Sequence, residues 1–152
     1  MAVNPEIQGR RLPPVGPYLV GREKVREFSR AVLAQSPLNS DPEAARAAGY
    51  ADVVAPPTFP VVVQEATLAQ LLAEPDTGID FTRVVHGDQR FSFVRPVVAG
   101  DELMAELTVT SVKSLGAHSM VTASTEVVDL DGELVLTAIS TLVVRGDEEA
   151  SA

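Results

Sequence analysis

Apolar positions along this chain change their spacing at about residue 81, where a helical period gives way to alternation. Ala105, Leu107 and Val109 are separated by single polar residues, which is typical of a strand that buries one face. This pattern predicts four strands, over residues 84–94, 103–112, 120–128 and 133–144. The pair Asp131 and Gly132 stands between the last two and predicts a tight hairpin. The second half of the chain therefore predicts an antiparallel sheet.

The first half of the chain predicts helices. A stripe of apolar side chains three or four residues apart indicates an amphipathic helix over residues 18–34, which Pro37 stops. Asp41 can cap a short second helix, because its carboxylate accepts from free N–H groups and Pro42 fits the first helical position. We expect this second helix to end near Gly49.

A third helix is predicted over residues 59–74, with Thr58 as its cap. Apolar residues cover nearly all of its sides, so we expect it to be buried. Helices followed by an antiparallel meander predict an α+β fold, in which a curved sheet wraps one long central helix. The chain then divides into an N-terminal wrapping arm at 1–20, one domain at 21–146 and a flexible acidic tail at 147–152.

Charge and composition narrow the classes of partner. The chain has 152 residues, enough for one domain, and a formal net charge of -9 at pH 7. Nucleic acid is not an expected partner, because binding it needs a basic surface. An acidic surface also repels acidic carrier proteins, although a local basic patch can still receive one.

The absence of cysteine excludes disulfides and Cys-ligated metals and is typical of a cytosolic protein. The sequence contains no apolar run of membrane-spanning length, no signal-peptide core, no Gly-rich phosphate loop and no metal-ligand cluster. We therefore expect a cytoplasmic protein with no membrane partner, no cofactor and no metal.

The segment from Val32 to Thr58, VLAQSPLNSDPEAARAAGYADVVAPPT, resembles the active-site region of the MaoC-like (R)-specific enoyl-thioester hydratases and dehydratases. That family adopts the hot-dog fold and carries Asp-x-Asn-Pro-x-His, followed by Asp-Pro, an Ala-rich helix and Gly. Anchored on Pro37, the catalytic Asp position falls on Ala34 and the catalytic His position on Asn39. Neither side chain can transfer a proton near neutral pH. The resemblance implies a retained scaffold that has lost its proton-transfer pair.

A second stretch, HGDQRFSFVRPVVAGDEL at residues 86–103, is similar to a strand and turn in the N-terminal half of two-domain hydratase 2 proteins. It is closer still to single-domain actinobacterial (3R)-hydroxyacyl dehydratase subunits, which resemble the non-catalytic N-terminal half of FAS1-like dehydratases. Those subunits also carry a GREKVREF-like helix, here at residues 21–28, and an APPTF turn, here at residues 55–59. The resemblance spans roughly residues 9–145. It implies that a partner half supplies Asp and His while this type of half shapes a tunnel for the acyl chain.

The turn before the central helix departs from the active pattern. Active members offer a backbone N–H to the thioester carbonyl there, and the matching position falls on Pro57, which has no N–H. Thr58 supplies the donor if the register differs by one. The resemblance therefore places Pro57, Thr58 and Phe59 on the substrate side. Arg90 and Arg95 are candidates for a phosphate of phosphopantetheine or CoA, although solvated arginines at a sheet edge are common.

His86 is the best remaining titratable candidate for catalysis, with Asp88 nearby, although a lone His on a strand is usually structural. Gly87 between them is typical of a bulge. His118, in a predicted hairpin turn, is expected to be solvated.

Three functions remain open. The first is a (3R)-hydroxyacyl-thioester dehydratase subunit that binds the acyl chain of acyl-ACP or acyl-CoA while a partner supplies the catalytic pair. The second is a stand-alone acyl-thioester-binding module without turnover. The third is a homodimeric dehydratase that uses a relocated His86. In each case an exposed sheet edge predicts a dimer, either homodimer or heterodimer.

Overall fold

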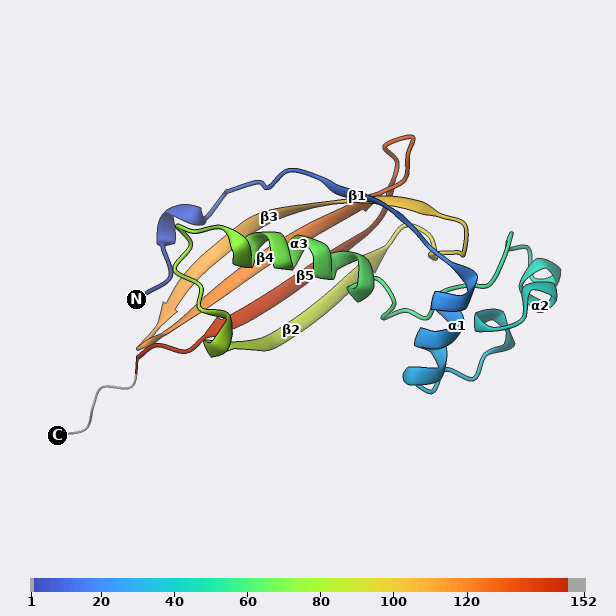
Figure 1. Cartoon of the computed structure of the whole chain (residues 1–152), viewed down its shortest axis with the longest axis horizontal. Helices are drawn as coiled ribbons and strands as arrows, with labels where there is room; N and C mark the ends of the chain where they lie inside the picture. The colour runs from blue at the N-terminus through green and yellow to red at the C-terminus, as the bar shows by residue number, and fades with distance from the viewer. Residues whose placement is uncertain (1, 148–152) are drawn as a thin grey trace.

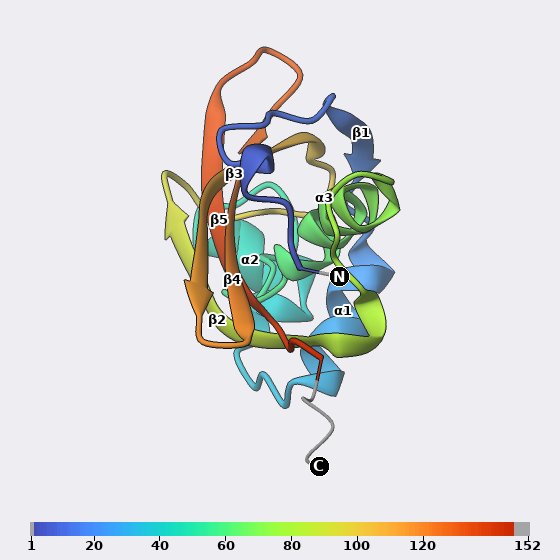
Figure 2. The same ribbon diagram turned by 90° about the vertical axis from the view of Figure 1, so that its left-hand side faces the viewer.

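A five-stranded antiparallel sheet curves around one central helix in the computed structural model, which describes residues 2–147 (Figures 1 and 2). The strands are β1 (Val15–Leu19), β2 (Val84–Phe93), β3 (Glu102–Leu115), β4 (His118–Val128) and β5 (Leu134–Val144). Their order across the sheet is β1-β3-β4-β5-β2. The central helix is α3 (Val61–Ala73). This arrangement confirms the predicted α+β hot-dog architecture, and residues 148–152 of the predicted tail lie outside the described residues.

Two further helices, α1 (Arg22–Ala31) and α2 (Pro42–Ala47), lie beyond one end of the sheet (Figure 1). Three short 3-10 turns complete the described part of the chain: η1 (Pro5–Ile7), η2 (Pro37–Asn39) and η3 (Phe81–Arg83). The predicted cap of α2 is confirmed, because the Asp41 carboxylate accepts a hydrogen bond from the Glu43 N–H at 2.9 Å. The predicted hairpin is also confirmed, with Gly132 in its turn at a φ of 80°.

The N-terminal arm contributes a strand that the sequence pattern does not predict. Tyr18 and Leu19 belong to β1, so the prediction that α1 begins at residue 18 is wrong. β1 pairs with β3, with Val15 opposite Ala105. A Cβ on Gly16 would lie 2.7 Å from the Leu103 carbonyl oxygen, so only glycine fits this close approach.

The central helix buries one face only, which corrects the prediction of a helix buried on all sides. Val63, Gln64, Thr67 and Leu71 are buried, whereas Glu65 and several small apolar residues of α3 are exposed in the single chain. The sheet lies on one side of α3, and no other strand covers the opposite side of the helix within residues 2–147 (Figure 2). The prediction that Thr58 caps this helix is also wrong, because Pro60 occupies the N-cap and no side chain caps the helix start.

Buried polar groups join the central helix to the sheet. The Gln64 side-chain amide donates to the Ser140 hydroxyl at 2.8 Å, and the hydroxyls of Thr67 and Thr125 lie 3.1 Å apart. All four residues are fully buried. Because a buried polar group is costly unless it is paired, these contacts favour one placement of the helix on the sheet.

The sheet ends at β2, which pairs with β5 on one side only. The register shifts between His86 and Asp88, which confirms the predicted bulge at Gly87. Val85 on this strand is 50% exposed. The described residues contain no helix long and apolar enough to cross a membrane.

Candidate functional site

Two positions singled out by the sequence, Asn39 and Pro57, meet in one pocket of about 440 Å³ beside the end of β2. The polar lining consists of Ser36, Asn39 and Arg95. Most of the lining is apolar and comes from Leu38, Val54, Ala55, Phe93, Val94 and Pro96. A pocket of this size and character suits an apolar ligand held by few polar groups.

Hydrogen bonds connect the three segments that form the pocket. The Val54 N–H donates to the Leu38 carbonyl at 2.8 Å, which joins the residues of η2 to the segment before α3. The Ala55 N–H donates to the Val97 carbonyl at 2.8 Å, which joins that segment to the turn after β2. The pocket is therefore built by tertiary pairing of residues 16 and 42 positions apart.

Asn39 stands where the resemblance expects a catalytic His, and the structure gives its side chain a bonding role. The half-buried amide donates to the Val54 carbonyl at 2.7 Å. The group does not titrate in the physiological range, so it cannot act as a general acid or base. Asn39 holds the wall of the pocket in place.

The charged residue at the pocket, Arg95, is already paired. Its guanidinium donates to both carboxylate oxygens of Asp101, at 2.8 and 3.3 Å. This hydrogen bond raises the pKa of Arg95. Asp101 also accepts from the Val98 N–H at 2.9 Å, which holds the turn after β2. Arg95 therefore brings little unbalanced charge to the pocket, and its predicted phosphate contact stays a prediction.

A second ion pair fixes α1 against the segment that leads into the pocket. Arg22 donates to both oxygens of Asp52, at 3.0 and 2.7 Å. The hydrogen bond from Arg22 lowers the pKa of Asp52 to about 2. Because Val53 and Val54 follow directly, this pair restrains the wall of the pocket.

Three other residues that the resemblance places near the substrate, Ala34, Thr58 and Phe59, do not line the pocket. Ala34, at the catalytic Asp position, is half-buried outside the pocket, and its N–H donates to the Ser29 carbonyl at 2.8 Å. The exposed Thr58 donates no backbone hydrogen bond within residues 2–147, so its N–H is available. Phe59 is fully buried and packs edge to face on Phe28, with ring centroids 5.3 Å apart.

His86, Asp88 and Arg90 lie on the exposed edge strand β2, and none of them lines the pocket. Asp88 pairs with Arg90 at 2.9 Å rather than with His86. His86 lies seven positions before Phe93, which corresponds to about 23 Å along a strand. Within one chain, His86 therefore lies toward the end of β2 opposite the pocket, and Asp88 lies in the middle of the strand. Between residues 2 and 147, no cluster of three or more His, Asp or Glu side chains could hold a metal.

The apolar pocket beside a wrapped central helix, with no acid or base at the degenerate positions, defines a hot-dog protein of the MaoC-like dehydratase class. The chain belongs to the family described as FAS1-like, dehydratase domain region, whose model matches residues 7–138. The resemblance inferred from the sequence is thus confirmed.

Similar proteins support this assignment at two levels. The UPF0336 protein Lxx02810 of Leifsonia xyli is 70% identical over 96% of this chain and 98% of its own length. One chain of the C-terminally truncated HadBC (3R-hydroxyacyl-ACP dehydratase) complex from Mycobacterium tuberculosis matches with a TM-score of 0.80 and 36% identity. That match covers 90% of this chain and 96% of the other. A MaoC-like dehydratase matches with a TM-score of 0.84 and 35% identity, over 91% of this chain but 42% of that longer protein.

Proposed function

We propose that this chain is the acyl-binding, non-catalytic subunit of a (3R)-hydroxyacyl-thioester dehydratase. The proposal rests on the apolar pocket of about 440 Å³, in which Asn39 replaces the expected His. Such a pocket can shelter an alkyl chain, and each buried methylene group contributes about 0.8 kcal/mol. The substrate is an acyl chain on ACP or CoA, and the proton-transfer residues belong to the partner subunit.

The free edge of β2 supports the need for a partner. An unpaired edge strand that carries exposed apolar side chains such as Val85 and Phe93 favours pairing with another chain. HadBC, to which this chain is similar, is described as a complex. We infer a heterodimer joined edge to edge with a catalytic MaoC-like subunit, and a homodimer is the alternative.

A dehydratase assay tests the division of labour. The purified chain alone is expected to hydrate crotonyl-type thioesters little or not at all, whereas its complex with a catalytic MaoC-like subunit is active. Activity of the isolated chain that depends on His86 would instead support the homodimeric enzyme. Binding of acyl thioesters without turnover in either preparation would support the stand-alone binding module.

A variant of the pocket tests where the acyl chain binds. Val94 lines the pocket and is 68% exposed, so Val94→Glu adds a charge there without disturbing the core. Loss of contact with two methylene groups raises KM by about fifteenfold in the two-chain enzyme. Leu130→Glu is the matched control, because Leu130 is 59% exposed on the hairpin and does not line this pocket. An equal effect of both variants on KM would show that the chain does not use this pocket.

A further inference from the structure

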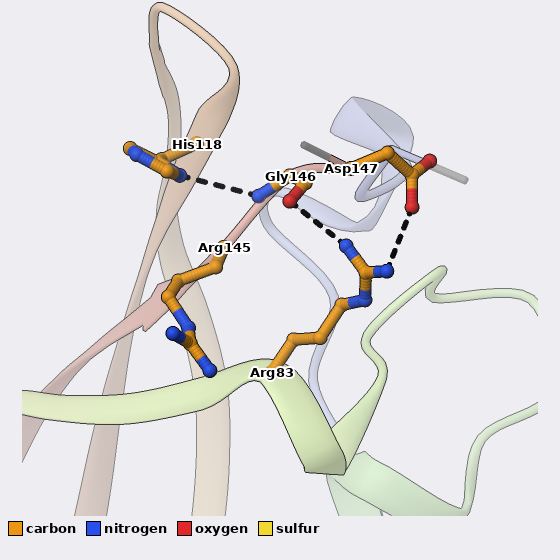
Figure 3. A pocket seen from close by; sticks show the side chains of 5 residues that line it. All are labelled: Arg83, His118, Arg145, Gly146 and Asp147. Atoms are coloured by element: carbon orange, nitrogen blue, oxygen red, sulfur yellow. Dashed lines mark hydrogen bonds and ion pairs between the residues drawn. The ribbon is translucent and has the colours of Figure 1, made fainter. Parts of the chain in front are cut away.

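A second pocket, of about 390 Å³, lies at the opposite end of the sheet from the apolar one. Arg83, His118 and Arg145 line it, together with Gly146 and Asp147 (Figure 3). These residues come from the end of η3 directly before β2, the start of β4 and the segment after β5. The tertiary fold therefore gathers two guanidinium groups and an imidazole that lie far apart in the sequence.

The charge of Arg83 is largely balanced. Its guanidinium lies 2.9 Å from the Asp147 carboxylate and 3.7 Å from that of Asp80, and it donates to the Gly146 carbonyl at 2.8 Å. Arg83 thereby holds the segment after β5 against the start of β2 (Figure 3). It forms one wall of the pocket.

Arg145 is different, because its side chain makes no ion pair or hydrogen bond with another residue in the described range 2–147. Its backbone N–H donates to the Arg83 carbonyl at 3.0 Å, which fixes its position beside Arg83. In a chain with a formal net charge of -9, this guanidinium is a local, uncompensated positive charge. Such a group attracts an anion more strongly than its surroundings do.

The imidazole ring of His118 lines the pocket in one tautomer. Its Nδ1 accepts a hydrogen bond from the Gly146 N–H at 3.2 Å. The neutral ring must then carry its proton on Nε2, because one nitrogen of a neutral imidazole donates while the other accepts. In Figure 3 this second ring nitrogen faces away from Arg145, so the planar guanidinium fork of Arg145 supplies the donors of the pocket. Such a fork is suited to the oxygens of a phosphate ester.

The position of the pocket at one end of the edge strand β2 is consistent with binding the phosphate of a carrier group. Two β2 edges that pair antiparallel about a twofold axis run in opposite directions, so the start of β2 lies beside the end of the partner's β2. In a partner of the same fold, the end of β2 borders the substrate pocket. The Arg145 pocket of this chain would then lie next to the site where the partner performs the reaction.

We propose that Arg145, in the pocket that His118 and Arg83 help to line, binds the phosphate of the phosphopantetheine group that carries the acyl thioester into the partner's active site. This inference rests on the proposed function for the identity of the ligand. The pocket itself is made by this chain alone, so the isolated full-length chain is sufficient to test it.

Calorimetric titration with 4′-phosphopantetheine and with pantetheine tests the phosphate contact. The wild-type chain is expected to bind the phosphorylated probe, with an affinity that falls as salt is added, and to bind pantetheine at least tenfold more weakly. Arg145→Gln weakens phosphopantetheine binding about tenfold. Arg30→Gln is the matched control, because Arg30 is exposed on α1 and loses the same charge, and it leaves binding unchanged. Binding of CoA but not of 4′-phosphopantetheine would identify the 3′-phosphate or pyrophosphate of CoA as the occupant and overturn the carrier-phosphate assignment.

Three results would overturn the site: no measurable binding of any phosphorylated probe, equal binding of pantetheine and phosphopantetheine, or an unchanged affinity in Arg145→Gln. If Arg145→Gln lowers the melting temperature, the variant is not a clean test of binding. The salt dependence of phosphopantetheine binding and its comparison with pantetheine, both measured on the wild-type chain, then test the phosphate site.

An octanoyl thioester without phosphate separates this inference from the proposed function. If that probe binds at Val94 while phosphorylated probes do not bind, the proposed function stands and the phosphate site fails. If phosphate binds at Arg145 but the two-chain preparation has no dehydratase activity, the proposed function fails while the phosphate site stands.

Discussion

Replacing Asn39 with alanine separates a structural role from a catalytic one. The Asn39 amide donates to the Val54 carbonyl at 2.7 Å, and that carbonyl accepts no other hydrogen bond among residues 2–147. Removing the donor leaves a half-buried acceptor without its partner. The loss of such a bond costs about 1–2 kcal/mol of unfolding free energy.

Urea unfolding measures this loss, and a thermal scan should show a lower Tm by about 2–8 °C for a chain of this size. Gln35→Ala is the control, because Gln35 is exposed in the same loop and makes no hydrogen bond within the described residues. In the two-chain enzyme at a temperature where the variant stays folded, kcat should remain close to that of the wild type.

Two results would refute this explanation of Asn39. An unchanged unfolding free energy would mean that the bond to Val54 contributes nothing. A loss of kcat of about 10²-fold or more in the folded complex would mean that Asn39 takes part in chemistry, since that is the usual effect of removing a general acid or base.

Three further predictions concern the edge strand and the ion pair. His86→Ala should leave most of the activity of the two-chain enzyme, and loss of turnover in a folded variant would instead assign catalysis to His86. Val85→Lys should weaken dimerisation measured by sedimentation, because a charge on an exposed edge opposes strand pairing, and unchanged association would exclude this edge. Arg22→Gln should lower the unfolding free energy slightly above pH 4, because an ion pair near the surface contributes little. Because the pKa of Asp52 is lowered from 3.8 to about 2, its stabilising effect is lost as pH falls through about 2, and the difference between variant and wild type in urea titrations should shrink through that pH and vanish below it. A difference that persists undiminished below that pH would assign the effect to something other than the pair.

Local signals in the sequence were sufficient for much of the fold. Alternation predicted strands β2 to β5, and the capped start of α2 followed from Asp41 and Pro42. These features depend on residues within a few positions of one another, so a single sequence contains the information. The resemblance to the MaoC-like pattern identified the degenerate positions Ala34 and Asn39, and the absence of an ionisable side chain there is a property of the residues themselves.

Tertiary structure decided what depends on distant partners. The segment VGPYL contains Gly and Pro and does not alternate, and only pairing with β3 makes it a strand. The exposed side of α3 follows from a sheet that covers one face, which composition cannot show.

The two pockets were beyond sequence reasoning for the same physical reason. Phe93 and Val94 join Leu38 only when the turn after β2 pairs with residues 53–55. Arg145 comes to lie beside Arg83 and His118 only when β5 pairs with both β2 and β4, which brings three chain segments to one end of the sheet. Period and capping are local properties of a chain, whereas a pocket is produced by contacts between segments that the sequence keeps apart.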